Sequence, residues 1–251
     1  MKDIIEDSDP LPAPPLWNLL LEARWMKEWV TGVIAGGPRD LPEGDGHGVL
    51  LLPGFLAGDR SLAPLARVLR RLGYRTYRSG LPINPGPTPA TLERLRRRVP
   101  EVIHRSGGSI SIVGQSLGGI YAREIARRTV GEVRMVITLG SPFRDGADTR
   151  ATPLANRLAR RWDREEAHPR GVPYRPLPVP TTCVYSRTDG IVPWRACVEE
   201  PGPRRENIEV RTSHIGMSVH PSVFRIVADR LAQPPGKWRP YRPERRRGGN
   251  A

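Results

Sequence analysis

The stretch Ser-Ile-Ser-Ile-Val-Gly-Gln-Ser-Leu-Gly-Gly-Ile, residues 109–120, decides the fold of this chain. Its first half has the pattern of a strand, and the segment after Ser116 has the pattern of a helix. A nucleophilic serine at such a junction needs a sharp, strained turn, and Gly114 and Gly118 let strand and helix come close. The stretch therefore predicts a nucleophile elbow at Ser116. The other interpretation is a solvated serine on a glycine-rich turn, whereas a phosphate-binding loop would need a lysine that is missing.

Strands and helices alternate on both sides of the elbow. The apolar run at 49–52 is typical of a strand buried on both faces. Further strands are predicted at 74–77, 109–113, 133–139, 181–185 and 208–211, and helices at 61–72, 91–105, 117–128 and 221–231. This order predicts an α/β fold of three layers, with a mainly parallel sheet of about six strands and helices on both faces.

One domain is predicted, over residues 16–232. The polar, proline-rich residues 1–15 are expected to form a disordered arm. Residues 143–178 interrupt the alternation, and we expect a short lid insertion there with a helix at 153–164. The tail at 233–251 is rich in Arg, Pro and Gly and is expected to trail from the domain.

Residues 16–34 are predicted to form one N-terminal helix. Its apolar residues recur at helical spacing and are Leu16, Leu19, Leu20, Ala23, Met26, Val30 and Ile34. This face favours packing against the domain. A helix at a lipid surface is the alternative, and the small number of Lys and Arg residues weighs against it.

A serine hydroxyl needs a base and a group that orients the base. After an elbow of this kind, an acid and then a histidine follow the serine along the chain. His214 comes after the predicted strand 208–211, at the end where such a sheet places its site, whereas His220 begins the last helix. Asp189 follows strand 181–185 in the same way. We predict Ser116, Asp189 and His214 as a triad; position in the chain excludes His47, His104 and His168.

Acyl transfer also needs two fixed N–H donors for the oxyanion. Leu117, after the nucleophile, is predicted to supply one, and Phe55, in the loop after the first strand, the other. Six residues are predicted to contact the substrate, although core packing explains the apolar ones equally well: Leu56, Gln115, Ile191, Val192, Ile215 and Met217.

The chain of 251 residues has 40 Lys and Arg against 26 Asp and Glu, a net charge of +14. This charge would suit a polyanion, but no helix-turn-helix, zinc-finger or aromatic-basic strand motif accompanies it, so no specific nucleic-acid partner is predicted. Cys183 and Cys197 are too few for a disulfide scaffold or a four-thiolate zinc site, and no metal or other cofactor is predicted. One disulfide and two buried thiols are both compatible with the sequence, and the thiols are favoured.

No apolar run is long enough to predict a transmembrane span, and the acidic start of the chain is unlike a signal peptide. A cytoplasmic location is therefore expected. Contact with a membrane surface and the oligomeric state are left open.

Five motifs, at 51–55, 114–119, 139–143, 186–193 and 213–216, make residues 48–231 resemble an α/β-hydrolase of the small bacterial esterase or lipase type. The resemblance implies a triad at Ser116, Asp189 and His214 and a covalent acyl-enzyme. The chain departs from the family pattern at Pro53, where His is common before the glycine.

The expected function is hydrolysis of carboxylic esters, with a small-molecule or lipid-like ester as substrate. An acyltransferase with the same triad is one alternative. The other is a basic binding protein that has the fold without the chemistry. The arginines of the insertion would suit an anionic substrate, but a solvated charged surface is the favoured interpretation.

Overall fold

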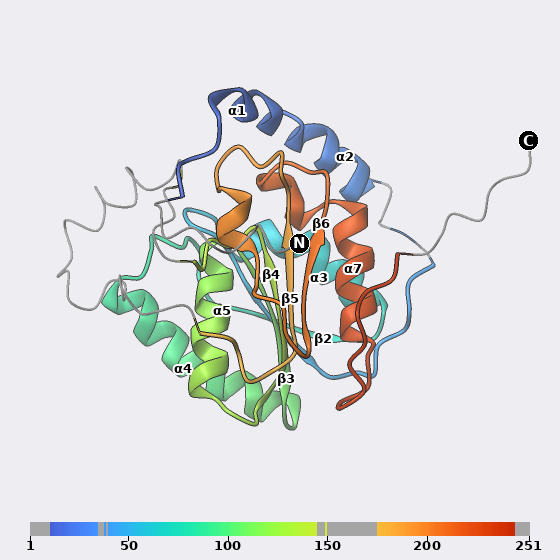
Figure 1. Ribbon diagram of the computed structural model, residues 1–251. Coiled ribbons are helices and arrows are strands. Elements are labelled where there is room, and N and C mark those ends of the chain that lie inside the picture. The colour runs from blue at the N-terminus through green and yellow to red at the C-terminus, as the bar shows by residue number, and fades with distance from the viewer. Residues whose placement is uncertain (1–10, 35–37, 39, 145–148, 150–174, 244–251) are drawn as a thin grey trace, which may run out of the picture.

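Six strands form one sheet in the computed structural model, which describes residues 11–34, 38, 40–144, 149 and 175–243 (Figure 1). The strands are β1 (Gly48–Leu52), β2 (Arg75–Arg78), β3 (Ile110–Gln115), β4 (Val133–Leu139), β5 (Thr181–Tyr185) and β6 (Arg205–Glu209). Their order is β2-β1-β3-β4-β5-β6, and every neighbouring pair is parallel. The carboxyl ends of all six strands therefore lie at one edge.

Helices cover both faces of this sheet. On one face α3 (Ala63–Arg71) and α7 (Pro221–Leu231) pack with Val49 and Leu51, and on the other α4 (Pro89–Ser106) and α5 (Leu117–Arg128) pack with Leu50 and Leu52. Successive side chains of a strand point to opposite faces, so the continuous apolar run of β1 serves both cores. The predicted three-layer fold is confirmed. The described residues also form three short 3₁₀ helices: η1 (Asp59–Leu62), η2 (Trp194–Cys197) and η3 (Ile215–Ser218).

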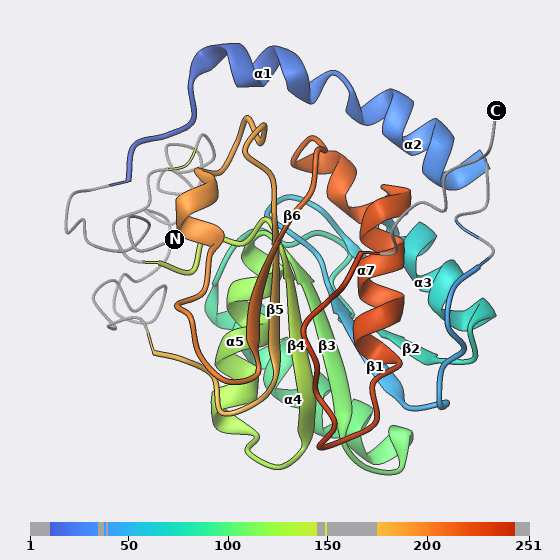
Figure 2. The same cartoon turned by 45° about the vertical axis from the view of Figure 1, so that its right-hand side comes forward.

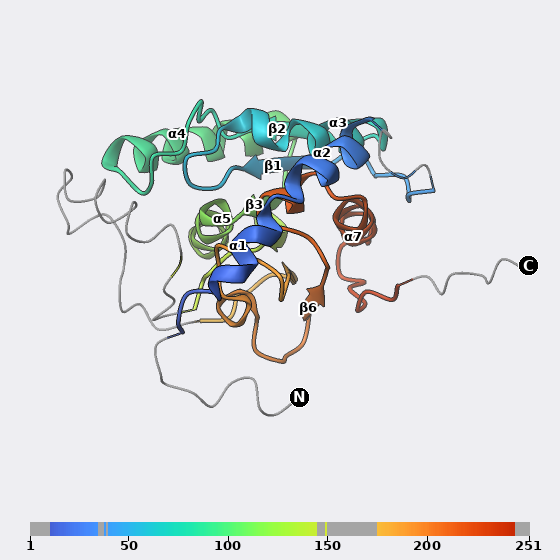
Figure 3. The same ribbon diagram turned by 90° about the horizontal axis from the view of Figure 1, so that it is seen from above.

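The N-terminal segment crosses the edge formed by the carboxyl ends of the strands (Figures 2 and 3). It is two helices, α1 (Leu16–Glu22) and α2 (Trp25–Ile34), where one was predicted. The chain turns between them, and the Arg24 guanidinium donates to the Leu21 carbonyl at 2.8 Å. No helix in the described part of the chain combines the length and apolar character needed to cross a membrane.

The prediction of which face of this segment packs inward was wrong. Leu20 is 79% exposed, whereas Asn18, Glu22 and Glu28 are each only 8% exposed. The polar side chains point inward because the loops beneath offer them backbone hydrogen-bond partners. Periodicity identifies two faces of a helix but does not say which of them packs.

Two predictions near the end of the chain also need correction. The last strand lies at 205–209, not 208–211, and its side chains are half-buried or exposed because it is an edge strand. Part of the tail does not trail: Tyr241 packs on the core, and its N–H donates to Glu206 at 2.7 Å. The predicted helix 153–164, most of the insertion and both chain ends lie outside the described residues.

Candidate active site

Ser116 sits on a strained turn between β3 and α5. Its φ of 50° and ψ of −122° are unusual for a residue with a side chain, and such a conformation costs about 1–3 kcal/mol. A Cβ on Gly114 would lie 2.3 Å from the Gly118 carbonyl oxygen, and one on Gly118 would lie 2.1 Å from that of Leu52. Both positions therefore require glycine. The Ser116 N–H donates to Leu139 at 2.8 Å, which ties the turn to the end of β4.

Asp189 and His214 form a buried pair at the same edge of the sheet. Asp189 follows β5, His214 follows β6, and the His214 Nδ1 lies 2.6 Å from the Asp189 Oδ2. The other carboxylate oxygen accepts the N–H groups of Ile191 and Val192, each at 2.8 Å. The carboxylate is therefore held from both sides and fixes the orientation of the imidazole. With Nδ1 engaged, Nε2 is the nitrogen left for proton transfer.

The electrostatics favour a basic imidazole. Burial alone would lower the pKa of His214, but the charge of Asp189, the hydrogen bond to it and the charge of Glu22 together raise that pKa above its usual 6.5. An imidazole beside a fixed carboxylate accepts a proton more readily and is held in one orientation.

Residues next to Ser116 contact His214, which places the two residues close to each other. Gln115, directly before Ser116, donates its amide to the His214 carbonyl at 3.1 Å. The His214 ring lies against Gly140, next to the Leu139 carbonyl that binds the Ser116 N–H. In the described part of the chain no hydrogen bond joins Ser116 Oγ to the imidazole, a contact that often tightens only when substrate binds.

The loop after β1 lies directly against the elbow. A Cβ on Gly54 would be 3.2 Å from the Ser116 Cβ, so the loop backbone almost touches the serine. Among the described residues, no group accepts a hydrogen bond from the N–H of Phe55 or of Leu117. Neither N–H group therefore has an acceptor within the described residues, and Leu117 directly follows Ser116 in the chain. The carbonyl of Pro53, in the same loop, accepts a hydrogen bond from a side chain.

That side chain belongs to Asn84, which is fully buried and holds the loop in place. Its side-chain amide donates to the Pro53 carbonyl at 2.9 Å. Its backbone carbonyl accepts the Leu56 N–H at 2.7 Å, and its backbone N–H donates to the Ala57 carbonyl at 2.7 Å. Leu56 has a φ of 57°, so the loop is strained where Asn84 binds it. No motif in the sequence marks Asn84 for this role.

Two buried carboxylates that sequence reasoning missed hold the loops of Asp189 and His214. Glu22 accepts the N–H groups of His214 at 2.8 Å, Gly190 at 2.9 Å and Ile215 at 3.3 Å. Glu28 accepts both the N–H, at 3.0 Å, and the hydroxyl of Ser213. Asn18 and Glu22 are four residues apart, on the side of the helix away from the apolar face. This spacing was the one feature of the sequence that could have indicated that the two side chains act together.

The predicted substrate contacts divide by exposure. Leu56 and Ile215 are almost half exposed, and Ile191 is half-buried. Val192 and Met217 belong to the core, and the Gln115 amide is engaged by His214. Of the six predicted contacts, Leu56, Ile191 and Ile215 are therefore the ones whose side chains reach the surface.

Two histidines outside the site have structural roles. His220 caps α7, where its ring accepts the Ser222 N–H at 3.2 Å. His47 lies between Asp45 and the Ser111 hydroxyl, which is 2.8 Å from its Nε2. This second Ser-His-Asp chain lies at the amino ends of the strands, and Ser111 is buried inside β3 without an elbow. It satisfies buried polar groups and offers no access to a substrate.

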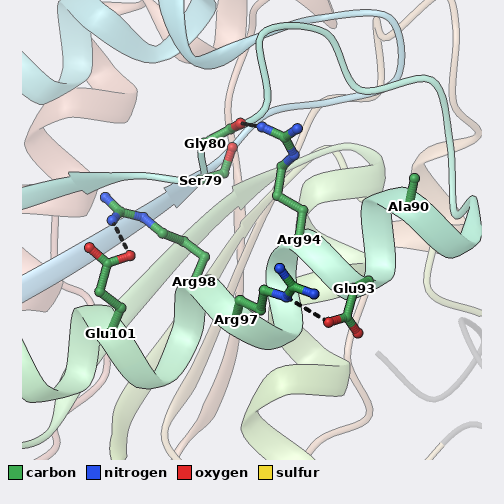
Figure 4. A pocket seen from close by; sticks show the side chains of 8 residues that line it. All are labelled: Ser79, Gly80, Ala90, Glu93, Arg94, Arg97, Arg98 and Glu101. Carbon is green, nitrogen blue, oxygen red and sulfur yellow. Dashed lines mark hydrogen bonds and ion pairs between the residues drawn. The ribbon is translucent and has the colours of Figure 1, made fainter.

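A charged hollow of about 520 Å³ lies beside α4, between it and the loop after β2 (Figure 4). Its arginines are already engaged: Arg97 pairs with Glu93, Arg98 pairs with Glu101, and Arg94 donates to Gly80. The hollow is lined by none of Ser116, Asp189 and His214 and is a solvated charged surface.

The cysteines and acidic groups show no second chemistry. Cys183 and Cys197 are free, buried thiols, which decides between the two interpretations of the sequence. Burial raises the pKa of Cys183 to about 12, so it is not a nucleophile at neutral pH. The described residues hold no cluster of His, Cys, Asp and Glu that could bind a metal.

Comparison with known proteins supports the fold. No family model matches this chain, and neither does any curated protein. Among solved structures, a pyrethroid hydrolase from Sphingobium faniae JZ-2 aligns with a TM-score of 0.55 at 19% identity, covering 75% of this chain and 98% of that one. A monoacylglycerol lipase from Paleococcus ferrophilus gives 0.54 at 15% identity, with 76% and 96% covered.

A carboxylesterase from Bacillus subtilis gives a TM-score of 0.52 at 15% identity, covering 84% of this chain and 97% of that one. These structures are α/β-hydrolases. With the six-stranded parallel sheet and its two helical layers, they show that this chain has the α/β-hydrolase fold.

Proposed function

We propose that this chain, with its α/β-hydrolase fold, is a serine hydrolase that cleaves carboxylic esters. The observation that carries the proposal is the buried His214–Asp189 pair at 2.6 Å, at the sheet edge that also carries Ser116 on its strained turn. A solvated serine on a simple turn would need neither the strain nor the buried pair.

In the first half of the reaction Ser116 Oγ attacks the ester carbonyl carbon, and His214 Nε2 takes the hydroxyl proton. The negative charge that forms on the carbonyl oxygen is bound by the N–H groups of Phe55 and Leu117. Asp189 holds the imidazole at Nδ1 and stabilises its positive charge. The C–O bond of the ester then breaks, His214 returns the proton to the leaving alkoxide, and an acyl-enzyme and an alcohol result.

In the second half His214 Nε2 takes a proton from water, and the water oxygen attacks the acyl carbon. The same two N–H donors bind the second oxyanion. The bond to Ser116 Oγ breaks, the proton returns to the serine, and a carboxylic acid leaves. Leu56, Ile191 and Ile215 supply apolar contacts for the acyl group.

A fluorophosphonate probe tests the nucleophile. Wild type is expected to be labelled once, at Ser116, and Ser116→Ala is expected to lose both labelling and turnover of nitrophenyl esters. Labelling that survives in Ser116→Ala would refute the assignment. The nitrophenyl esters, in a series of rising chain length, then measure how the apolar contacts select the acyl group.

A further inference from the structure

The outward side of α1 and α2 is apolar although both helices lie at the surface. We call this the outer face and define it by six residues that are 46–79% exposed: Leu16, Trp17, Leu20, Met26, Trp29 and Val30. An ordinary surface helix turns such residues to the core and its polar residues to solvent. Here the polar residues point inward, so packing against the domain does not explain the outer face.

This orientation is fixed by specific contacts. The inward side donates or accepts hydrogen bonds through Asn18, Glu22 and Glu28, which hold the loops of Asp189 and His214. A Cβ on Gly216 would lie 1.7 Å from the Glu28 carboxylate, so the loop beneath is shaped to receive that side chain. Turning the apolar side inward would leave two carboxylates without these donors. The outer face therefore remains exposed to whatever lies above it.

The exposed charge within residues 16–34 favours an anionic partner. Residues 16–34 include four charged side chains: Glu22 and Glu28 are buried, Arg24 is half-buried, and Lys27 is exposed. The two negative charges are thus turned in and the two positive charges are at or near the surface. Exposed arginines at the same edge of the sheet, Arg60, Arg195 and Arg211, extend the positive region.

We propose that the outer face docks this protein on the surface of an anionic phospholipid bilayer. Trp and Leu on one side of a helix, with cations beside them, suit the boundary between headgroups and acyl chains. A second copy of this chain is the other candidate occupant, but two chains of net charge +14 repel each other, whereas anionic lipid attracts each of them.

Docking would turn the candidate site toward the lipid. The two helices lie over the carboxyl ends of the strands (Figure 3), where Asn18 and Glu22 bind the loops of Asp189 and His214. The exposed Leu56 follows β1 and the exposed Ile215 follows β6, so both belong to the same edge of the sheet. If the proposed ester hydrolysis holds, the bilayer would present lipid esters beside Ser116. The docking surface itself does not depend on that chemistry.

Vesicle sedimentation with the full chain tests the proposal. Wild type is expected to sediment with vesicles of phosphatidylcholine and phosphatidylglycerol in equal parts, and about tenfold less with pure phosphatidylcholine. The triple variant Trp17→Ser, Leu20→Ser, Trp29→Ser should bind the anionic vesicles at least about tenfold more weakly. Val130→Ser is the matched control: Val130 is 71% exposed in the turn before β4, at the opposite edge, and its loss should change nothing.

Lys27→Glu keeps the apolar residues and tests the charge on its own, so the proposal stays testable even if the triple variant misfolds. It should weaken binding to anionic vesicles about tenfold. All variants should hydrolyse a short soluble ester as wild type does. If the wild-type protein has no esterase activity, the proposed function is refuted, whereas the vesicle result still tests the docking surface. Three results would overturn the docking proposal: wild type that does not sediment, a triple variant that binds like wild type, or a wild-type dimer that the triple variant abolishes.

Discussion

Replacing Glu22 by Gln should slow catalysis and shift its pH dependence. Glu22 accepts three backbone N–H groups, from His214, Gly190 and Ile215. The amide keeps one oxygen acceptor and turns an NH₂ group toward an N–H that had been bonded. Losing a hydrogen bond to a charged group costs about 1.5–3 kcal/mol, so the free energy of unfolding should fall by about that amount. If 1.4 kcal/mol of this loss appears in the transition state, kcat falls about tenfold.

The direction of the pH shift follows from the charge of Glu22. Only neutral His214 can act as base, so activity is lost as pH falls through its pKa. That pKa is raised partly by Glu22, and removing the charge lowers it. The acid limb of kcat/KM should therefore move to lower pH in Glu22→Gln.

Glu28→Gln is the matched control for this experiment. Glu28 is equally buried, but it binds Ser213 and not His214. It should lower stability without moving the acid limb. An acid limb that stays in place in Glu22→Gln, or moves to higher pH, would refute the reasoning; urea unfolding and a pH series of kcat/KM provide both measurements.

Four further substitutions separate catalysis from structure. His214→Ala should abolish ester turnover, whereas His220→Ala should keep it and lower the free energy of unfolding by about 1 kcal/mol, because His220 only caps a helix. Turnover assays and urea unfolding measure the two effects. Turnover that is lost in His220→Ala and kept in His214→Ala would show that His214 is not the base. Asn84→Ala should lower kcat at least about tenfold, because the loop that carries the Phe55 N–H loses the hydrogen bond from the Asn84 side chain. The stoichiometry of fluorophosphonate labelling should change little. An unchanged kcat would show that Asn84 does not position this loop. Glu199→Ala should cost about 3–5 kcal/mol in urea unfolding because it leaves Arg123 buried without its carboxylate, and a loss below 1 kcal/mol would contradict this.

Local sequence patterns were sufficient where burial on both sides constrains the chain. The elements at 117–128, 133–139, 181–185 and 221–231 have the predicted bounds, because an apolar run or a helical pattern ends there at polar or turn residues. The edge strand β6 was misplaced by three residues at its start. Its Arg205-Glu206-Asn207 segment lacks an apolar signal and pairs only on one side.

In the candidate site too, some residues could be predicted from local sequence patterns and others could not. Ser116, Asp189 and His214 each follow a strand, and parallel strands bring their carboxyl ends together, so motif and topology were enough to place them at one edge. The residues that hold them, Glu22 and Asn84, act through backbone groups far away in the sequence. No local pattern marks such a contact. The same limit explains why the inward face of α1 was predicted wrongly.

Ser116, as the proposed nucleophile of an ester hydrolase, should form a covalent adduct with a fluorophosphonate. Mass spectrometry of the intact protein after this reaction, followed by peptide mapping, measures the adduct and its position. We predict one adduct on the peptide that contains Ser116, formed in wild type and absent in both Ser116→Ala and His214→Ala. An adduct on Ser111 or elsewhere, or one that persists in Ser116→Ala, would show that Ser116 is not the nucleophile.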